Sequence, residues 1–179
     1  MRLLDRVDVP ERTQAARAAR RSRAAQLLLV GSEPVPTARR SRILAAQTQA
    51  LWDVIADPHH LPRWWPRVAR VEDVEGNAFT EVMKTAKGKV VRADFELVTS
   101  DEPRTLRWEQ RLAGTPFGRL LSSATTTVSL QAADGGTRVT IELRQQLTGF
   151  LPRFGSYMVR RAAVATIEEA LDGLERISG

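Results

Sequence analysis

Four aromatic rings that can ligate metals, move protons or bind apolar groups lie within one short segment, DPHHLPRWWPRV (57–68). His59 and His60 are the only histidines of the chain, and Trp64 and Trp65 follow them closely. Imidazoles ligate metals and transfer protons near neutral pH, whereas indole rings bind apolar ligands or fill a core. This segment is therefore the first candidate for a metal site, an acid–base centre or a ligand-binding surface.

The surrounding residues favour neither metal binding nor nucleophilic catalysis. Adjacent histidines are poorly placed to ligate one metal, and no H-x-x-H or H-E-x-x-H spacing accompanies them. The chain has no cysteine, no serine in a G-x-S-x-G motif, and no phosphate-loop spacing in AGTPFGRL (113–120). We therefore predict no metal, no cofactor and no catalytic residue, and we expect both histidines in a solvated turn.

The periodicity of the apolar residues predicts the elements that position these rings. RRSRILAA (39–46) alternates as a short strand, and TQALWDVIAD (48–57) has helical spacing with Thr48 as its N-cap. Five or six runs with period-two alternation follow, separated by short turns. Residues 151–177 then have a helical period. Such a meander needs a cover for its apolar face, and this last helix is the only apolar element long enough.

The first 38 residues have a different composition from the rest. Residues 1–40 carry +5 of the net charge of +6, and residues 10–30 are rich in the helix formers Ala, Arg, Gln and Leu. The segment GSEPVPTA then reads as a linker. We predict an N-terminal helical arm with its linker (1–38) and one folded domain (39–179). The arm is expected to be separable and to make at most weak, salt-sensitive contact with nucleic acid or an anionic surface.

From about Arg39 to Ile177 the chain resembles the START-like (SRPBCC) superfamily, which includes polyketide cyclases, ring-hydroxylase domains and plant lipid-binding proteins. The resemblance is carried by ALWDVIADPHHLPRWWPRV, by DGGTRVTIEL and by the long C-terminal helix entered through GFLPRF. It implies an α+β helix-grip fold, in which a seven-stranded antiparallel sheet grips the C-terminal helix. It also implies a deep, mainly apolar pocket between them, without fixing one activity.

Strand alternation indicates which side chains face that pocket. Two glutamines fall on inward faces that are otherwise apolar, and the small residues of SSATTT leave room beside them. The terminal helix contributes one hydroxyl and one cation a turn apart, and one tryptophan of the WW pair lies nearer the pocket mouth. The predicted ligand-binding residues are Trp65, Phe95, Trp108, Gln110, Ile141, Leu143, Gln145, Tyr157 and Arg161.

We predict a protein that binds an apolar or aromatic small molecule, lipid-like or polyketide-like, without catalysis, because no inward acid–base pair stands out. One alternative is a polyketide cyclase or aromatase that uses the same pocket. The other is a macromolecular interaction module that uses the basic arm. No apolar run approaches the roughly 20 residues of a membrane helix. The apolar residues 27–30 are too short for a signal-peptide core. We therefore expect a cytoplasmic protein.

Overall fold

The structure, a computed structural model, describes residues 37–85, 88–148 and 153–179. The side chains of residues 153, 154 and 156 are not described. The predicted arm helix at 10–30 lies outside these ranges, so the division of the chain into an arm and a domain stays a prediction.

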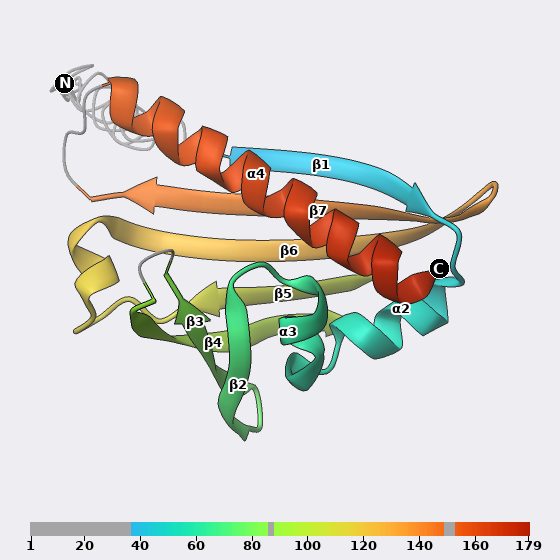
Figure 1. Ribbon diagram of the computed structural model, residues 1–179, viewed down its shortest axis with the longest axis horizontal. Helices are drawn as coiled ribbons and strands as arrows, with labels where there is room; N and C mark the ends of the chain where they lie inside the picture. Colours follow the sequence, from blue (N-terminus) through green and yellow to red (C-terminus); the bar gives the residue numbers. More distant parts are fainter. Residues whose placement is uncertain (1–36, 86–87, 149–152) are drawn as a thin grey trace, which may run out of the picture. The chain divides into compact units, whose positions relative to one another are not determined.

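Seven strands and a long C-terminal helix make up most of the described chain (Figure 1). The strands are β1 (Thr37–Leu44), β2 (Val68–Glu75), β3 (Ala78–Lys84), β4 (Val90–Asp101), β5 (Thr105–Gln110), β6 (Leu121–Ala133) and β7 (Gly136–Leu147). The helices are α2 (Thr48–Ile55), η1 (Pro58–His60), α3 (Leu61–Trp64), η2 (Pro116–Arg119) and α4 (Arg153–Ser178). The predicted α+β architecture is confirmed.

All seven strands form one antiparallel sheet in the order β1-β7-β6-β5-β4-β3-β2. Only β1 is out of sequence order, because the chain passes from β1 through the short helices before it returns to the sheet at its opposite edge. The register sets side chains in rows across the sheet. Trp108 pairs with Leu97 on β4 and with Thr126 on β6, and Thr126 pairs with Leu143 on β7.

The helix α4 crosses one face of the sheet, and α2 and α3 lie near its C-terminal end (Figure 1). Its buried stripe has the helical period that the sequence shows, with Ile167, Leu171 and Leu174 at most 1% exposed. A row of ion pairs links the helix to β1. Arg42 contacts Asp172 at 2.6 Å and Glu175 at 2.9 Å, and these acidic partners raise the pKa of the guanidinium further. The stripe and the ion pairs fix the rotation of α4 over the sheet.

One local detail differs from the sequence-based expectations. The N-cap of α2 is Gln47, so Thr48 is the first residue of the helix, and its hydroxyl lies 3.1 Å from that of Thr137. Thr137 in turn donates to the carbonyl of Ala46, so this pair joins the start of the helix to β7. The segment 113–120 contains the turn of 3-10 helix η2, where the side chain of Thr115 accepts from Gly118 N.

Gly173 allows α4 to approach the backbone of α3 closely. A Cβ at this position would lie 2.4 Å from the carbonyl oxygen of Trp64 and 2.7 Å from its Cα. We expect Gly173→Ala to lower the free energy of unfolding by about 1–3 kcal/mol, because one of the two helices must shift. Helix propensity alone gives the opposite sign, since Ala is favoured over Gly by about 1 kcal/mol.

Urea denaturation measures this change. Ala165→Gly, at an exposed position of the same helix, is the matched control and should lose only the propensity of about 1 kcal/mol. A Gly173→Ala variant more stable than the parent protein would contradict the close approach of the two helices.

Candidate functional site

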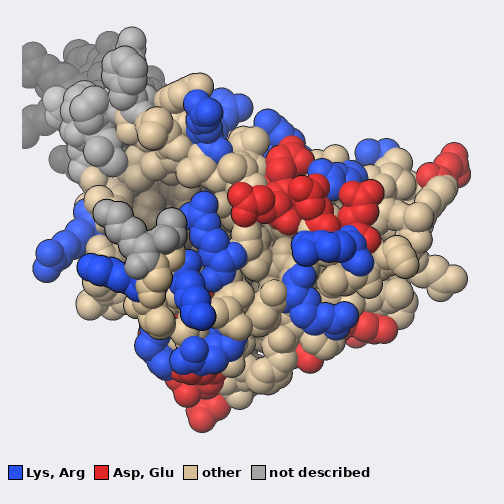
Figure 2. Space-filling view, in the orientation of Figure 1, with Lys and Arg blue, Asp and Glu red and all other residues tan. Residues whose placement is uncertain are grey.

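A cavity of about 350 Å³ lies between the N-terminal half of α4 and the sheet, and it is called the main cavity below. Figure 2 shows a hollow on this face of the molecule, with Lys and Arg side chains beside it. The volume is in the range of sites for small organic molecules, which start at roughly 300 Å³. Its wall consists of Trp65, Arg67, Glu81, Met83, Phe95, Trp108, Gln110, Phe117, Leu121, Ala124, Thr125, Thr126, Leu143, Gln145, Ala162, Ala163 and Thr166.

The sheet register explains why distant parts of the sequence meet in this wall. Phe95 and Gln110 are cross-strand partners on β4 and β5, and Ala124 and Gln145 are partners on β6 and β7. The helix α4 contributes only small side chains here, including Ala162 and Ala163. Small residues on the helix facing larger ones on the strands leave the space unfilled, whereas bulky residues fill the interface closer to the C-terminus of α4.

Most of the predicted ligand-binding residues come together in this wall. The structure places Trp65, Phe95, Trp108, Gln110, Leu143 and Gln145 around the main cavity. Their contact with a ligand stays a prediction, but their convergence follows from the alternation that selected them.

Ile141, Tyr157 and Arg161 are not part of the wall. Ile141 shares the inward face of β7 but has no exposed surface and belongs to the packed core. Tyr157 is 62% exposed, and Arg161 is also exposed. A helix turns about 100° per residue, so Tyr157 lies about 80° from the buried Ile167 around the axis of α4. The expected apolar stripe of the helix therefore does not extend to its N-terminal turns.

Glu81 in the wall of the main cavity was not anticipated from the sequence. It is only 1% exposed, and its Oε1 atom has no hydrogen-bond partner among the described residues. Burial raises the pKa of this carboxyl group from its ordinary value near 4.5 to about 8, because desolvation disfavours the charged form. The alternation of β3 contains the signal, since Phe79, Glu81 and Met83 share one face and the outer two are apolar.

Glu81 has no cation close enough to form an ion pair among the described residues. Among the described residues, Arg67 is the only other charged residue in the wall of the main cavity, and it is itself exposed. At neutral pH the carboxyl group of Glu81 therefore retains its proton. The described wall of the main cavity is largely apolar and aromatic, and its polar groups are two amides, two threonines of β6, Thr166, the exposed guanidinium of Arg67 and one uncharged carboxylic acid.

Ring contacts join aromatic residues of the cavity wall to aromatic residues of the packed core. Trp65 lies edge-on between Trp64 and Trp108, with centroid distances of 5.3 Å and 5.7 Å. Phe79 stacks on Phe95 at 5.4 Å. Such aromatic pairs add roughly 0.5–1.5 kcal/mol beyond their burial. The segment at 57–68 therefore contributes packing through Trp64, and its second ring, Trp65, reaches the cavity.

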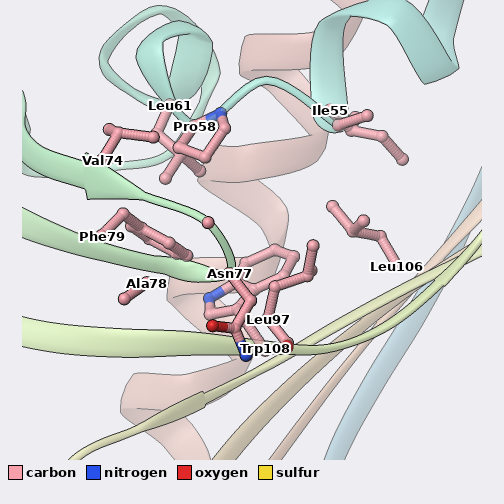
Figure 3. Close-up of a pocket in the computed structure, with 12 residues that line it drawn as sticks. Ile55, Pro58, Leu61, Val74, Asn77, Ala78, Phe79, Leu97, Leu106 and Trp108 are labelled. Carbon is pink, nitrogen blue, oxygen red and sulfur yellow. Dashed lines mark hydrogen bonds between the residues drawn. The ribbon is translucent and has the colours of Figure 1, made fainter.

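A smaller apolar pocket of about 100 Å³ shares Trp108 with the main cavity. Figure 3 shows Ile55, Pro58 and Leu61 across this pocket from Trp108 and Leu97. Its volume is below that of most ligand sites, so we take the main cavity as the candidate site. Two further depressions of about 390 and 460 Å³ lie at turns and helix ends, and half of the residues that border them are exposed.

The two histidines lie apart from the main cavity. They belong to the turn of 3-10 helix η1, where the Asp57 carboxylate accepts from the backbone N–H of His59 at 2.9 Å. His59 is exposed and His60 is half-buried. Within the described ranges, no three His, Asp or Glu side chains are grouped so that they could hold a metal ion. Nor does any described helix combine the length and the apolar composition needed to cross a membrane.

The chain belongs to the polyketide cyclase/dehydrase and lipid transport family, whose model matches residues 36–179. It therefore belongs to the START-like (SRPBCC) superfamily that the sequence predicted. No curated protein matches the sequence.

Solved structures share the fold at low sequence identity. The di-domain ARO/CYC StfQ from the steffimycin biosynthetic pathway has a TM-score of 0.67 at 15% identity, over 80% of this chain and 51% of that one. The chain thus spans about half the length of StfQ. A START superfamily protein from Mycobacterium smegmatis gives 0.64 at 13% identity, over 79% and 96% of the two chains. TTHA0849 from Thermus thermophilus gives 0.60 at 26% identity, over 79% and 95%.

Proposed function

We propose that this domain binds an apolar or aromatic small molecule, lipid-like or polyketide-like, in the main cavity. The observation that carries the proposal is a cavity of about 350 Å³ walled by aromatic and apolar side chains with a few polar groups among them. Ligand sites have this composition, because apolar contact provides affinity and a few placed polar groups provide orientation. Membership in a family of cyclases, dehydrases and lipid carriers supports the same reading.

A single observation favours the second candidate, a polyketide cyclase or aromatase. A carboxyl group with a pKa of about 8 can act as a general acid or base near neutral pH, and Glu81 is such a group in the wall of the cavity. Binding remains the first proposal, because the described part of the wall offers Glu81 no second acid or base as a partner. Turnover of a poly-β-ketone mimic that is lost in Glu81→Gln would move the cyclase to first place. The third candidate, an interaction module that uses residues 1–38, rests on the sequence alone.

The proposal is tested by binding of 1-aminoanthracene, an uncharged three-ring fluorophore. We expect its fluorescence to rise on binding and the emission of Trp65 and Trp108 to be quenched, since both rings line the cavity. Ala162→Trp should weaken this binding by about tenfold or more, an affinity loss of about 1.4 kcal/mol, because the new ring occupies the cavity from α4.

The matched control is Ala165→Trp, because Ala165 is an exposed alanine of α4 outside the wall. It should leave the affinity for 1-aminoanthracene unchanged. Equal affinities in both variants would place the probe elsewhere and remove the support for the main cavity as a binding site.

A further inference from the structure

The carboxyl group of Glu81 is an unusual component of an apolar cavity wall. Its strand neighbours in register are Val71 on β2 and Ala93 on β4, neither of which has a polar side chain. Phe95 and Trp108 belong to the same wall. The Oε1 atom is buried and has no partner within the described part of the chain. Buried polar groups of native proteins are nearly always hydrogen-bonded, so an unpaired one suggests that its partner is a ligand.

The state of this carboxyl group determines which ligand atom can pair with it. Arg67 is the one cation in the described wall, it is exposed, and it makes no ion pair with Glu81. Without a cation, burial favours the uncharged acid. An uncharged carboxylic acid has one O–H donor, whereas an ionised carboxylate has acceptors only. A carbonyl oxygen is a ligand acceptor that satisfies this donor without bringing a charge into the cavity.

We propose that Glu81 is the polar anchor of the main cavity and that its uncharged carboxylic acid donates a hydrogen bond to the carbonyl oxygen of an otherwise apolar, uncharged ligand. This inference rests on the proposed function and narrows it to a class of ligand. Neutral ketones and similar carbonyl compounds fit the site. Pure hydrocarbons leave the donor of Glu81 unpaired. Fatty acids bring an ionised carboxylate into a wall that has only the exposed Arg67 to offset it.

The other polar groups of the wall provide internal controls. Gln110, Gln145 and Thr126 also carry donors and line the same space, from β5, β7 and β6. An amide or hydroxyl donor does not titrate in the accessible pH range, whereas the donor of Glu81 disappears when the acid ionises. Guanidinium groups are not deprotonated in proteins. A preference for carbonyl ligands that depends on pH therefore identifies Glu81 and no other group in the described wall.

The experiment compares 9-fluorenone with fluorene, two uncharged three-ring molecules that differ by one carbonyl oxygen. Affinities are measured by quenching of tryptophan emission at pH 6.5 and at pH 9.5. We expect the protein to prefer 9-fluorenone by about tenfold or more at pH 6.5 and to lose that preference at pH 9.5. Glu81→Gln should keep a preference at both pH values, because its amide N–H₂ still donates. Glu81→Met should bind both molecules without preference.

A second readout reports the hydrogen bond itself. The infrared carbonyl band of bound 9-fluorenone should lie at lower frequency in the parent protein than in Glu81→Met. Binding of both molecules with an equal affinity in the parent protein and in Glu81→Met, and with the same carbonyl frequency, overturns the anchor but leaves ligand binding in the cavity intact. Binding of neither molecule overturns the proposed function and the anchor together.

Discussion

Replacing Glu81 by glutamine should change the free energy of unfolding more favourably at pH 9 than at pH 5. The difference between the variant and the parent protein should shift toward the variant as the pH rises. The side chain is only 1% exposed and has no ion-pair partner among the described residues, and burial raises its pKa to about 8. The free energy that the protein loses by ionising this group is absent from the glutamine variant. Because both side chains have nearly the same shape, the packing around position 81 is retained.

The direction follows from proton binding in the two states. Between about pH 4.5 and pH 8 the folded protein holds the proton of Glu81 while the unfolded chain has released it. The free energy of unfolding of the parent protein therefore falls as the pH rises across this window, and it levels off above the folded pKa. Each pH unit within this window lowers the free energy of unfolding by about 1.4 kcal/mol. The total loss across the window is therefore at most about 5 kcal/mol. The glutamine variant lacks this contribution at every pH.

Urea denaturation at pH 5 and pH 9 measures the difference. The control is Glu75→Gln, the same substitution at an exposed residue of the adjacent strand β2. Its effect on the free energy of unfolding should be small and equal at the two pH values. A Glu81→Gln variant whose stability difference from the parent is the same at pH 5 and pH 9 would falsify the assignment of Glu81 as an uncharged buried acid.

Much of this fold can be predicted from the sequence, because its strands and its long helix have regular apolar periods. The alternation of the strands and the apolar stripe around Ile167 and Leu171 predict the sheet and the helix that covers it. Each stretch of alternation also selects one face of its strand, and Trp108, Gln110 and Gln145 lie on the faces selected in this way. The sheet needs only the antiparallel register to bring such faces together.

That periodicity does not tell which residues along an inward strand face reach the cavity. Nor does it tell how the covering helix is rotated about its axis. Ile141 and Leu143 share one face of β7, but only Leu143 reaches the cavity, because α4 packs tightly against the sheet on the side of Ile141. Tyr157 continues a helical spacing that looks apolar in the sequence, yet it falls beyond the buried stripe. The alternation of a strand shows which residues face inward. It specifies neither where α4 leaves a space above the sheet nor how α4 is rotated there.

Glu81 shows a different limit of sequence reasoning. A glutamate between Phe79 and Met83 on one strand face reads as an interruption of an apolar pattern, and the usual resolution is that the charge reaches solvent at an edge. In the structure β2 and β4 flank β3 on both sides, and the α3–β2 connection with Trp65 and Arg67 also contributes to the wall beside it. The burial of the carboxyl group is therefore a property of the curled sheet and not of β3 alone.

The second large expected effect concerns the paired tryptophans. Replacing Trp64 should mainly lower stability, whereas replacing Trp65 should mainly weaken ligand binding. Trp64→Ala is expected to lower the free energy of unfolding by about 3–5 kcal/mol. For a domain of this size that is a fall in Tm of roughly 10 °C or more. Trp64 is 2% exposed, packs on Trp65 at 5.3 Å, and lies outside the wall of the main cavity. At a temperature where the variant is folded, its affinity for 1-aminoanthracene should be unchanged.

Trp65→Ala should cost less stability and more binding. Its ring is 9% exposed and borders the main cavity, so it has fewer protein atoms to lose on that side. We expect a weaker affinity for 1-aminoanthracene together with a smaller fall in Tm than in Trp64→Ala. Trp64→Phe is the matched control, because it keeps a ring in the core and removes an indole Nε1 that has no hydrogen-bond partner among the described residues.

Thermal unfolding and 1-aminoanthracene titration of the three variants separate packing from recognition. The packing assignment requires a ranked loss of stability, with Trp64→Ala largest and Trp64→Phe smallest. It also requires that only Trp65→Ala loses affinity for the probe. Unchanged Tm values in both alanine variants, combined with loss of binding in both, would instead make the pair a recognition surface. In that case the edge-on contact of Trp65 with Trp108 at 5.7 Å would belong to a ligand-binding surface rather than to the core.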